Sequence, residues 1–305
     1  MLNCYHRSLL NLSNTRLVKL IKHNCTQMKN FLILPIALLL TVAAFAQKKG
    51  APVNIITYNI RLNVASDGIN AWPNRKDNVK ALVKFHDADI LCVQEALPEQ
   101  FDALLEGSNF DVVGVGRDDG KRKGEFSAVY YDKDRFTKKD GGTFWLSETP
   151  DVPSKGWDAA LNRVCSWVRL YDKLNKKEFL VFNTHYDHIG VQARIESAKL
   201  LKQKIQQIAP TLPVVFTGDL NVTPETEAIA TIKSFLIDAK EVSAEKPYGP
   251  TGTFNAFHFD SDLKDRIDYI FVNKGFKVQK FAVLSDSKDK RYYSDHLPVF
   301  ARLWF

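Results

Sequence analysis

Short apolar runs of strand length recur along most of the chain. They are rich in β-branched and aromatic residues, which favour extended structure. The runs that we interpret as strands cover residues 53–58, 90–93, 112–115, 127–131, 143–146, 164–170, 179–183, 213–217, 267–272, 277–284 and 298–303.

Fewer stretches repeat their apolar residues at helical spacing. Residues 74–85 and 192–208 each place such residues along one face, with Lys and Gln opposite them in the second stretch. Pro224 followed by Glu225 is typical of the first turn of a third helix. The strands are too many for one open sheet, so we expect an α/β protein with two packed sheets and helices outside them.

The first 46 residues have a different character. An apolar run over residues 31–45 follows Lys29, and Ala44 and Ala46 end it in the small-x-small pattern of a secretory signal peptide. We therefore expect a protein exported to the periplasm or beyond, a mature chain that begins near Gln47 and no stable membrane span after processing. An uncleaved anchor is the alternative, and Met28 is a plausible translation start. Residues 1–46 are then an N-terminal extension and signal peptide, and residues 47–305 form one domain.

Most of the formal net charge of +7 belongs to this N-terminal part. Residues 1–46 carry five basic side chains and no acidic ones, which leaves 37 Lys and Arg against 35 Asp and Glu in the remainder. Proteins that bind duplex DNA usually show a clear basic surface, because neutralising phosphates supplies most of their non-specific affinity. A nearly neutral domain argues against duplex DNA as a partner.

Polar residues follow several of the predicted strands, where α/β proteins commonly place functional groups. Asn59 closes the first strand and Glu95 follows the second. An Asn in this place alone is more often a turn former, and Glu95 alone is equally consistent with a solvated side chain. An acid at the end of a buried strand is costly unless it is paired or binds a metal, and a carboxylate suits a hard cation.

A denser cluster contains His185, Asp187 and His188. In an extended chain His185 and Asp187 share one face and His188 takes the other. The set could bind zinc, but no further His or Cys accompanies it, which favours contact with a phosphate instead.

The strand that ends at Thr217 is followed by Gly218, Asp219 and Asn221. A glycine lets the backbone approach a ligand closely. In an extended chain Asp219 and Asn221 face the same way, so that one can orient or deprotonate a water and the other can donate to a phosphoryl oxygen.

Two further acids accompany a histidine. Asp268 begins an apolar strand, and Asp295 directly precedes His296. If Asp268 lies beside His296, it sets the tautomer of the imidazole and raises its basicity; an isolated structural acid is the alternative.

In this order and combination, the residues resemble the endonuclease/exonuclease/phosphatase superfamily. That group includes the DNase I-like nucleases, inositol polyphosphate 5-phosphatases, bacterial sphingomyelinases and deadenylases. The resemblance covers residues 53–305 and rests on the Gly-Asp-Leu-Asn, Ile-Asp-Tyr and Ser-Asp-His elements at Asp219, Asp268 and His296. It implies a four-layer sandwich of two stacked mixed β-sheets flanked by helices, with the site at one end of the sheets.

The resemblance also implies roles for individual residues. Glu95 looks like the main ligand of Mg²⁺ or Mn²⁺, with Asn59 beside it and Asp295 within reach of the metal.

On the substrate side, the family pattern implies that His185 contacts the scissile phosphate and that Asp219 aligns or deprotonates the attacking water. Asn221 supports the phosphate, and Asp268 holds His296 as an acid, a base or a stabiliser of charge.

Some positions depart from the family pattern. The DNA-repair nucleases have an acid two residues after the Asn, where this chain has Arg61. The segments 116–120, 124–126 and 144–147 resemble a secreted branch of the family. Outside the general pattern, we consider four residues as substrate contacts, with structural ion pairs as the alternative: Arg163, Asp187, His188 and Arg194.

The sequence thus predicts an exported, divalent-metal-dependent enzyme that hydrolyses a phosphate monoester or diester with activated water. We expect a monomer and a small or lipid-derived phosphate ester as substrate. The alternatives are a secreted nuclease and a non-catalytic binding module on the same fold; the complete set of polar residues argues against the latter.

Overall fold

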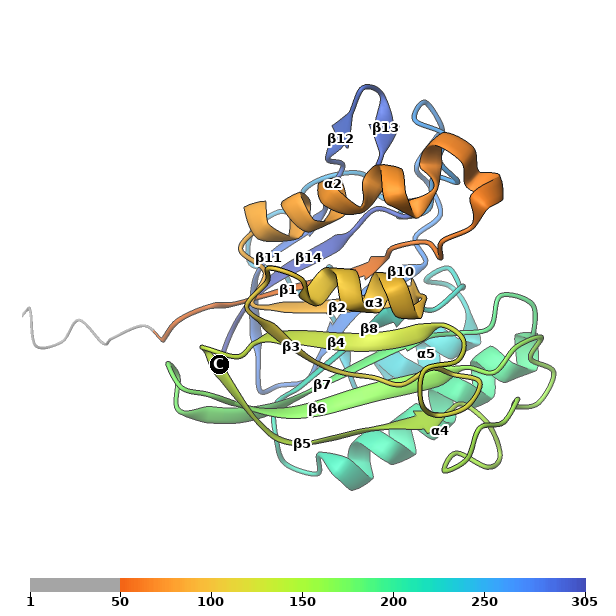
Figure 1. Cartoon of the computed structure of the whole chain (residues 1–305). Coiled ribbons are helices and arrows are strands. Elements are labelled where there is room, and N and C mark those ends of the chain that lie inside the picture. The colour runs from red at the N-terminus through yellow and green to blue at the C-terminus, as the bar shows by residue number, and fades with distance from the viewer. Residues whose placement is uncertain (1–49) are drawn as a thin grey trace, which may run out of the picture. The chain divides into compact units, whose positions relative to one another are not determined.

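The computed structural model describes residues 50–305 (Figure 1). The predicted signal peptide, its cleavage near Gln47 and the domain boundary fall on residues outside this part of the chain. Among the helices of residues 50–305, none is both long and apolar enough to cross a membrane.

One six-stranded sheet combines strands from both ends of the described chain. Its order is β11 (Lys277–Val283), β14 (Val299–Trp304), β1 (Val53–Asn59), β2 (Ile90–Ala96), β4 (Phe126–Asp132) and β3 (Phe110–Val113). β1 and β2 are parallel, and the other neighbours are antiparallel.

The second six-stranded sheet has the same plan, with one parallel pair inside it. Its order is β5 (Phe136–Trp145), β6 (Val164–Asp172), β7 (Lys177–His185), β8 (Val214–Asp219), β10 (Asp268–Val272) and β9 (Ile237–Asp238). β7 and β8 are the parallel pair. A separate hairpin consists of β12 (Ser287–Lys288) and β13 (Arg291–Tyr292).

Three apolar cores separate four layers. The central core lies between the sheets and contains inward-facing residues such as Ile55, Val181 and Ile270. The outer core of the first sheet lies under α2 (Trp72–Phe85) and α3 (Pro98–Leu105). The short 3-10 helix η1 (Ala65–Asn70) precedes α2 in the chain. The outer core of the second sheet packs under α4 (Val191–Ile208) and α5 (Glu227–Lys233). This is the predicted four-layer sandwich (Figure 1).

The eleven predicted strands and two longer predicted helices are present, with shifts of a few residues at most ends; β5 begins at Phe136, well before the predicted start at residue 143. The third predicted helix begins at Glu227, three residues after Pro224. The elements that the pattern missed are all short: η1, α3, β9 and the β12–β13 hairpin. They contain too few residues for a periodicity to become visible, and α3 follows β2 after a single residue.

The topology brings the polar residues to one edge of the sandwich. The parallel strands β1, β2, β7 and β8 all point their carboxyl ends toward this edge, where the chain leaves the sheets as loops. The antiparallel strand β10 begins at the same edge. In the ladder His185 therefore lies opposite Asp219, and Asp219 lies opposite Asp268.

A buried hydrogen-bond network joins the two sheets just below this edge. The Asn183 amide donates to the carbonyls of Val93 (2.8 Å) and Ala128 (2.9 Å) in the facing sheet. Its oxygen accepts from Gln94 Nε2 (2.6 Å) and Thr217 Oγ1 (3.2 Å). Because buried polar groups are costly unless paired, the network fixes how the sheets face each other beneath the site.

Candidate active site

Glu95 reaches the site through an irregularity in β2. The pairing of β2 with β4 shifts register between Val93 and Ala96, and Glu95 has a φ of 64°. Such a bulge turns a side chain away from the regular alternation of the strand. The Glu95 carboxylate accepts from Asn59 Nδ2 (2.9 Å) and from the N–H of Leu62 (3.0 Å).

Asn59 holds two carboxylates through its amide nitrogen. Its Oδ1 accepts from the N–H of Arg61 (3.0 Å), which fixes the orientation of the amide because that N–H can only donate. The Nδ2 then donates to Glu95 and to Asp219 Oδ2, each at 2.9 Å. In this arrangement Asn59 positions the predicted ligand Glu95, and the second lone pair of its Oδ1 is left for the metal contact that the sequence predicted.

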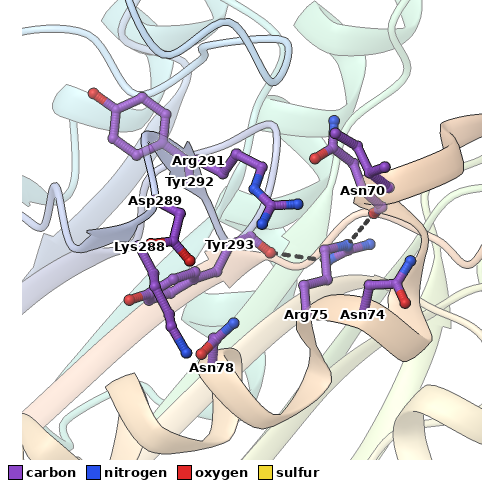
Figure 2. Close-up of a pocket in the computed structure, with 10 residues that line it drawn as sticks. Asn70, Asn74, Arg75, Asn78, Lys288, Asp289, Arg291, Tyr292 and Tyr293 are labelled. Atoms are coloured by element: carbon purple, nitrogen blue, oxygen red, sulfur yellow. Dashed lines mark hydrogen bonds between the residues drawn. The ribbon is translucent and has the colours of Figure 1, made fainter.

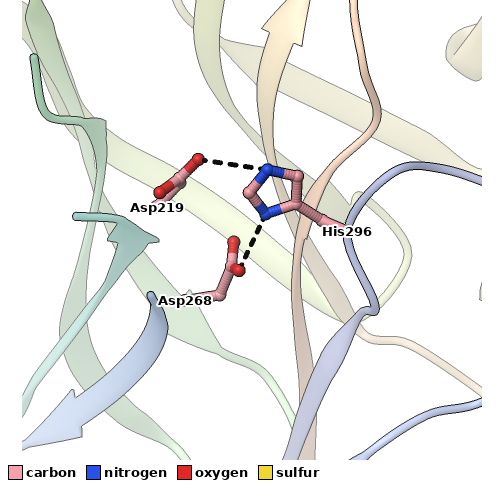
Figure 3. Close-up of side chains that lie close together, drawn as sticks. All are labelled: Asp219, Asp268 and His296. Carbon is pink, nitrogen blue, oxygen red and sulfur yellow. Dashed lines mark hydrogen bonds and ion pairs between the residues drawn. The ribbon is translucent and has the colours of Figure 1, made fainter. Parts of the chain in front are cut away.

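Asp268, His296 and Asp219 form a chain of buried groups (Figure 3). His296 Nδ1 lies 2.9 Å from Asp268 Oδ2, and Nε2 lies 3.7 Å from Asp219 Oδ2. The Thr253 hydroxyl accepts from the N–H of Asp268 (3.2 Å). His296 is thus hydrogen-bonded to Asp268 and forms an ion pair with Asp219, and one ligand atom from each of the three residues lies within 4.8 Å of the others, so the group could also reach one ion.

The surroundings of these groups shift their pKa values. Burial alone would lower the pKa of His296, but the charges of Asp268 and Asp219 outweigh it and raise the pKa well above its usual value. Burial, together with the charge of Asp268, raises the pKa of Asp219 to about 7. His296 is therefore held as a cation, and Asp219 can exchange a proton near neutral pH.

His185 faces the same carboxylate from the other side. Its Nε2 lies 3.5 Å from Asp219 Oδ2 and 3.0 Å from Asn221 Nδ2. The Asn221 amide also donates to the carbonyl of Tyr186 (3.0 Å), so Nε2 accepts and Nδ1 carries the proton, facing Glu125 Oε2 at 4.0 Å. Burial and the nearby arginines keep the pKa of His185 well below its usual value, which leaves the ring neutral.

Asp219 and Asn221 come together through a turn and not through the extended alternation that we expected. β8 ends at Asp219, and Asn221 has a φ of 50°. The N–H of Asn221 then donates to Asp219 Oδ1 (3.0 Å). Gly218, expected to bring the backbone close to a ligand, instead lies against β7, where an added Cβ would come within 2.3 Å of the Thr184 carbonyl oxygen.

Asp187 does not share a face with His185, because β7 ends at His185 and the chain turns. Its buried carboxylate accepts from four backbone N–H groups at 2.8–3.2 Å, those of Ala160, Leu161, Ile189 and Gly190. Burial alone would raise the pKa of Asp187, but these hydrogen bonds lower it well below its ordinary value. Asp187 therefore stabilises the loop beside the site, in place of the direct substrate contact that we predicted.

The remaining three candidates for substrate contact surround Asp187. Arg194 Nη1 donates to the Asp187 carbonyl (2.9 Å). Arg163 Nε lies 3.4 Å from Asp187 Oδ2, and its Nη2 lies 3.1 Å from His188 Nδ1. The structure thus places Arg163 near His185, whereas Arg194 is engaged with the loop itself.

Asp295 lies on the other side of the site from Asp187, close enough to Glu95 for the charge of Glu95 to act on it. Ser294 Oγ donates to the Asn59 carbonyl (2.7 Å) and also lies 3.2 Å from Asp295 Oδ1. Burial raises the pKa of Asp295, and the charge of Glu95 raises it further. Arg61 lies 3.9 Å from Asp295 but is paired with Asp67 at 3.0 Å. The carboxylates of Glu95 and Asp295 form an oxygen-donor set that fits a hard divalent cation.

Arg117 and Glu125 lie in the segments 116–120 and 124–126, to which the sequence assigned no role in the site. Arg117 Nη1 donates to Glu125 Oε2 (2.7 Å), the same oxygen that faces His185. Phe254 was not considered, yet its ring packs edge-on against His296 with 5.1 Å between centroids. Glu125 directly precedes β4, so polar residues at the starts of strands are a signal that could have identified it. Phe254 lies in a loop.

Residues 56–296 match the sequence model of the endonuclease/exonuclease/phosphatase family. The chain belongs to this family. Its members are phosphoesterases and nucleases, which places the chain among the hydrolases of phosphate esters.

Individual family members agree with this assignment. The mannosyl-6-phosphatase of Bacteroides thetaiotaomicron VPI-5482 is 41% identical, covers 83% of this chain and 100% of its own, and superimposes with a TM-score of 0.80. A family protein of Bacteroides vulgatus is 38% identical with a TM-score of 0.79, covering 83% of this chain and 98% of its own.

Among curated relatives, an uncharacterized protein of Acanthamoeba polyphaga mimivirus is 29% identical over 159 residues. The match covers 49% of this chain and 59% of the viral protein, so the chain spans less than two thirds of that relative.

Proposed function

We propose that this chain is an exported, divalent-metal-dependent phosphoesterase that hydrolyses a small phosphate ester with a water activated at Asp219. The observation that carries the proposal is the position of the Asp219 carboxylate. Its Oδ2 lies 2.9 Å from Asn59, 3.5 Å from His185 and 3.7 Å from His296. A general base works best when its pKa lies near the operating pH, and that of Asp219 is raised to about 7.

Each of the neighbouring groups has a part in the proposed reaction. Asp219 accepts the proton of the attacking water. His296, kept as a cation by Asp268, stabilises the negative charge that develops on the phosphoryl group and can supply a proton to the departing oxygen. His185, held at Nε2 by Asn221, borders the place where the phosphoryl group would bind.

The residues present fit Mg²⁺ or Mn²⁺. Glu95 and Asp295 would hold the ion, and Asn59 would orient Glu95. When bound, such an ion polarises the phosphoryl oxygens and neutralises developing charge.

The choice of substrate rests on a relative. Because a protein 41% identical over most of the chain is a mannosyl-6-phosphatase, a phosphorylated sugar is the first small ester to test. A lipid-derived phosphate ester is the second. The proposal of export rests on the apolar run over residues 31–45.

The decisive experiment measures phosphate release from mannose 6-phosphate and p-nitrophenyl phosphate with Mg²⁺, with Mn²⁺ and with EDTA. We expect activity that EDTA abolishes and that Asp219→Asn reduces by roughly 10²- to 10⁴-fold, the range of acid–base groups. The exposed Asp262 gives a matched control, and Asp262→Asn should leave the rate unchanged. Full activity in EDTA or in Asp219→Asn would refute the proposal.

A further inference from the structure

Arg75, in the first turns of α2, is a buried arginine that lines a pocket between α2 and the β12–β13 hairpin (Figure 2). Its hydrogen-bond partners are all main-chain carbonyls. Nε donates to Asn70 (2.7 Å), Nη2 to Arg61 (2.7 Å), and Nη1 to Tyr293 (3.1 Å) and Ile60.

Two aromatic rings fix the guanidinium further. Its Cζ lies 5.3 Å from the ring centre of Trp72 and 5.6 Å from that of Phe257, distances at which a cation is attracted to a ring. Phe257 belongs to the loop that binds the Asp295 carbonyl through the N–H of Asn255 (2.8 Å). The position of Arg75 is therefore set by α2 and by a loop that runs beside Asp295.

Three of the four carbonyls that Arg75 binds lie in two segments next to the proposed metal ligands, one that hydrogen-bonds Glu95 and one that carries Asp295. Ile60 and Arg61 precede Leu62, whose N–H donates to Glu95 Oε2 (3.0 Å). Tyr293 lies two residues before Asp295.

The sheet ladder does not hold these segments together. The pairing of β1 with β14 ends at Thr57 and Val299, so both segments lie beyond it. Ser294 Oγ joins them through the Asn59 carbonyl, and Asn59 Nδ2 and Arg61 Nε approach His296 and Asp295 at 3.4 and 3.9 Å. Arg75 adds hydrogen bonds to three carbonyls of the two segments.

Holding a charge at this buried position is costly. Burial lowers the pKa of Arg75, which shows that the surroundings disfavour its charged form. Apolar side chains of similar volume stabilise a core as well as buried charges do, or better. What an apolar side chain could not provide is a rigid fork of donors that reaches several carbonyls at once.

We propose that Arg75 is a positioning residue that sets the separation of Glu95 and Asp295 and thereby the affinity of the site for a divalent cation. The inference rests on the proposed function, because it requires that the two carboxylates share an ion. Mg²⁺ accepts little deviation from its preferred ligand distances, and partners that orient metal ligands typically contribute 10- to 100-fold in affinity.

The test is a titration of the full chain with Mn²⁺, in which electron paramagnetic resonance measures the free ion. Arg75→Met removes all donors, and Arg75→Lys keeps the charge without the planar fork. We expect the Kd for Mn²⁺ to rise about 10- to 100-fold in Arg75→Met and by less in Arg75→Lys. The kcat at saturating Mn²⁺ should stay within about threefold, because the groups around Asp219 are untouched.

The matched control is Lys84→Met, on the exposed side of the same helix, which should bind Mn²⁺ like the wild type. Thermal unfolding without metal shows whether each variant folds. If Arg75→Met fails to fold, the Kd of Arg75→Lys for Mn²⁺ tests the proposal in its place. A folded variant with unchanged Kd, or with fewer binding sites of unchanged affinity, would show that Arg75 is only structural. A wild-type protein that binds no Mn²⁺ would overturn the metal dependence in the proposed function as well.

Discussion

The pKa values of the two histidines of the site are shifted in opposite directions by their neighbours. Burial lowers the pKa of both, but His296 lies between the carboxylates of Asp268 and Asp219, whereas His185 is exposed to the charges of Arg163 and Arg117. His296 is therefore suited to stabilise negative charge, and His185 acts as a neutral ring. The same residue type thus obtains two roles from its surroundings.

A double-mutant cycle tests whether Asp268 and His296 work as a unit. Asp268→Asn should disturb the tautomer of His296 and reduce kcat by about 10²-fold, on the scale of acid–base groups. The combined Asp268→Asn and His296→Ala variant should be little worse than His296→Ala alone, because groups that act together show non-additive losses. Steady-state kinetics at saturating Mg²⁺ provide the measurement. Logarithmic losses that simply add would mean that the residues act independently.

The contribution of Asp187 to stability should depend on pH. Its folded-state pKa is lowered, so its carboxylate stabilises the fold fully above the usual value of about 4, and this contribution is lost as the pH falls further. Asp187→Asn should cost about 1–3 kcal/mol at pH 7, because backbone N–H groups lose their acceptor.

Urea unfolding at several pH values measures the gap in the free energy of unfolding between the wild type and Asp187→Asn. The gap between Asp187→Asn and the wild type should stay constant from pH 7 to about 5 and narrow below pH 4. Asp134→Asn, at an exposed position, is the control. A gap that does not change down to pH 3 would argue against the ionised carboxylate as the source of the stabilisation.

At the scale of the elements, the site depends on where strands stop. Glu95 is turned by the irregular end of β2, and Asn221 by the turn after β8. Beneath them, Asn183 on β7 links the two sheets, since its amide spans from one sheet to two carbonyls of the other. Regular strands thus supply the frame, and their irregular ends orient the side chains.

Replacing Asn183 by aspartate tests the link. Asn183→Asp would face the carbonyls of Val93 and Ala128 with oxygens and bury a charge, at a cost of roughly 3 kcal/mol or more in the free energy of unfolding. Chemical denaturation measures the loss. Gln203→Glu, the same change of amide to carboxylate at an exposed position on α4, should change stability by less than about 0.5 kcal/mol. Equal effects of the two substitutions would mean that the inter-sheet network does not stabilise the fold.

At the scale of the whole molecule, the balance of charge bears on the choice of substrate. Outside residues 1–46 the chain has 37 basic and 35 acidic side chains, so little charge is available to displace counterions from a polyanion. Arg61, which stands where DNA-repair relatives have an acid, is paired with Asp67 at 3.0 Å.

We therefore expect weak or no nicking of plasmid DNA at about 0.15 M salt with Mg²⁺ or Mn²⁺, because such a surface gives little non-specific affinity. Gel analysis of supercoiled plasmid shows the outcome, with mannose 6-phosphate hydrolysis measured on the same preparation. Efficient nicking that disappears in Glu95→Gln would make a nuclease the better assignment while leaving the fold and the site in place.

The sequence by itself was sufficient for the fold class and most of the elements. Strand-length apolar runs and helical repeats are local patterns, and each reports the side of an element that will be buried. The polar residues at strand ends could be recognised for the same reason: Asn59, Glu95 and Asp219 interrupt apolar runs at the points where the chain leaves the sheet.

Only the tertiary structure decided how these residues face one another. The extended-chain rule placed Asp187 beside His185, but the strand ends there, and Asp187 turns to bind the loop backbone. Arg75 carries no local signal, because its partners at Ile60 and Tyr293 lie far away in the sequence and are main-chain atoms of any residue type. Sequence pattern predicts what is buried; the directions of side chains beyond the strands depend on turns and long-range hydrogen bonds that form only in the folded chain.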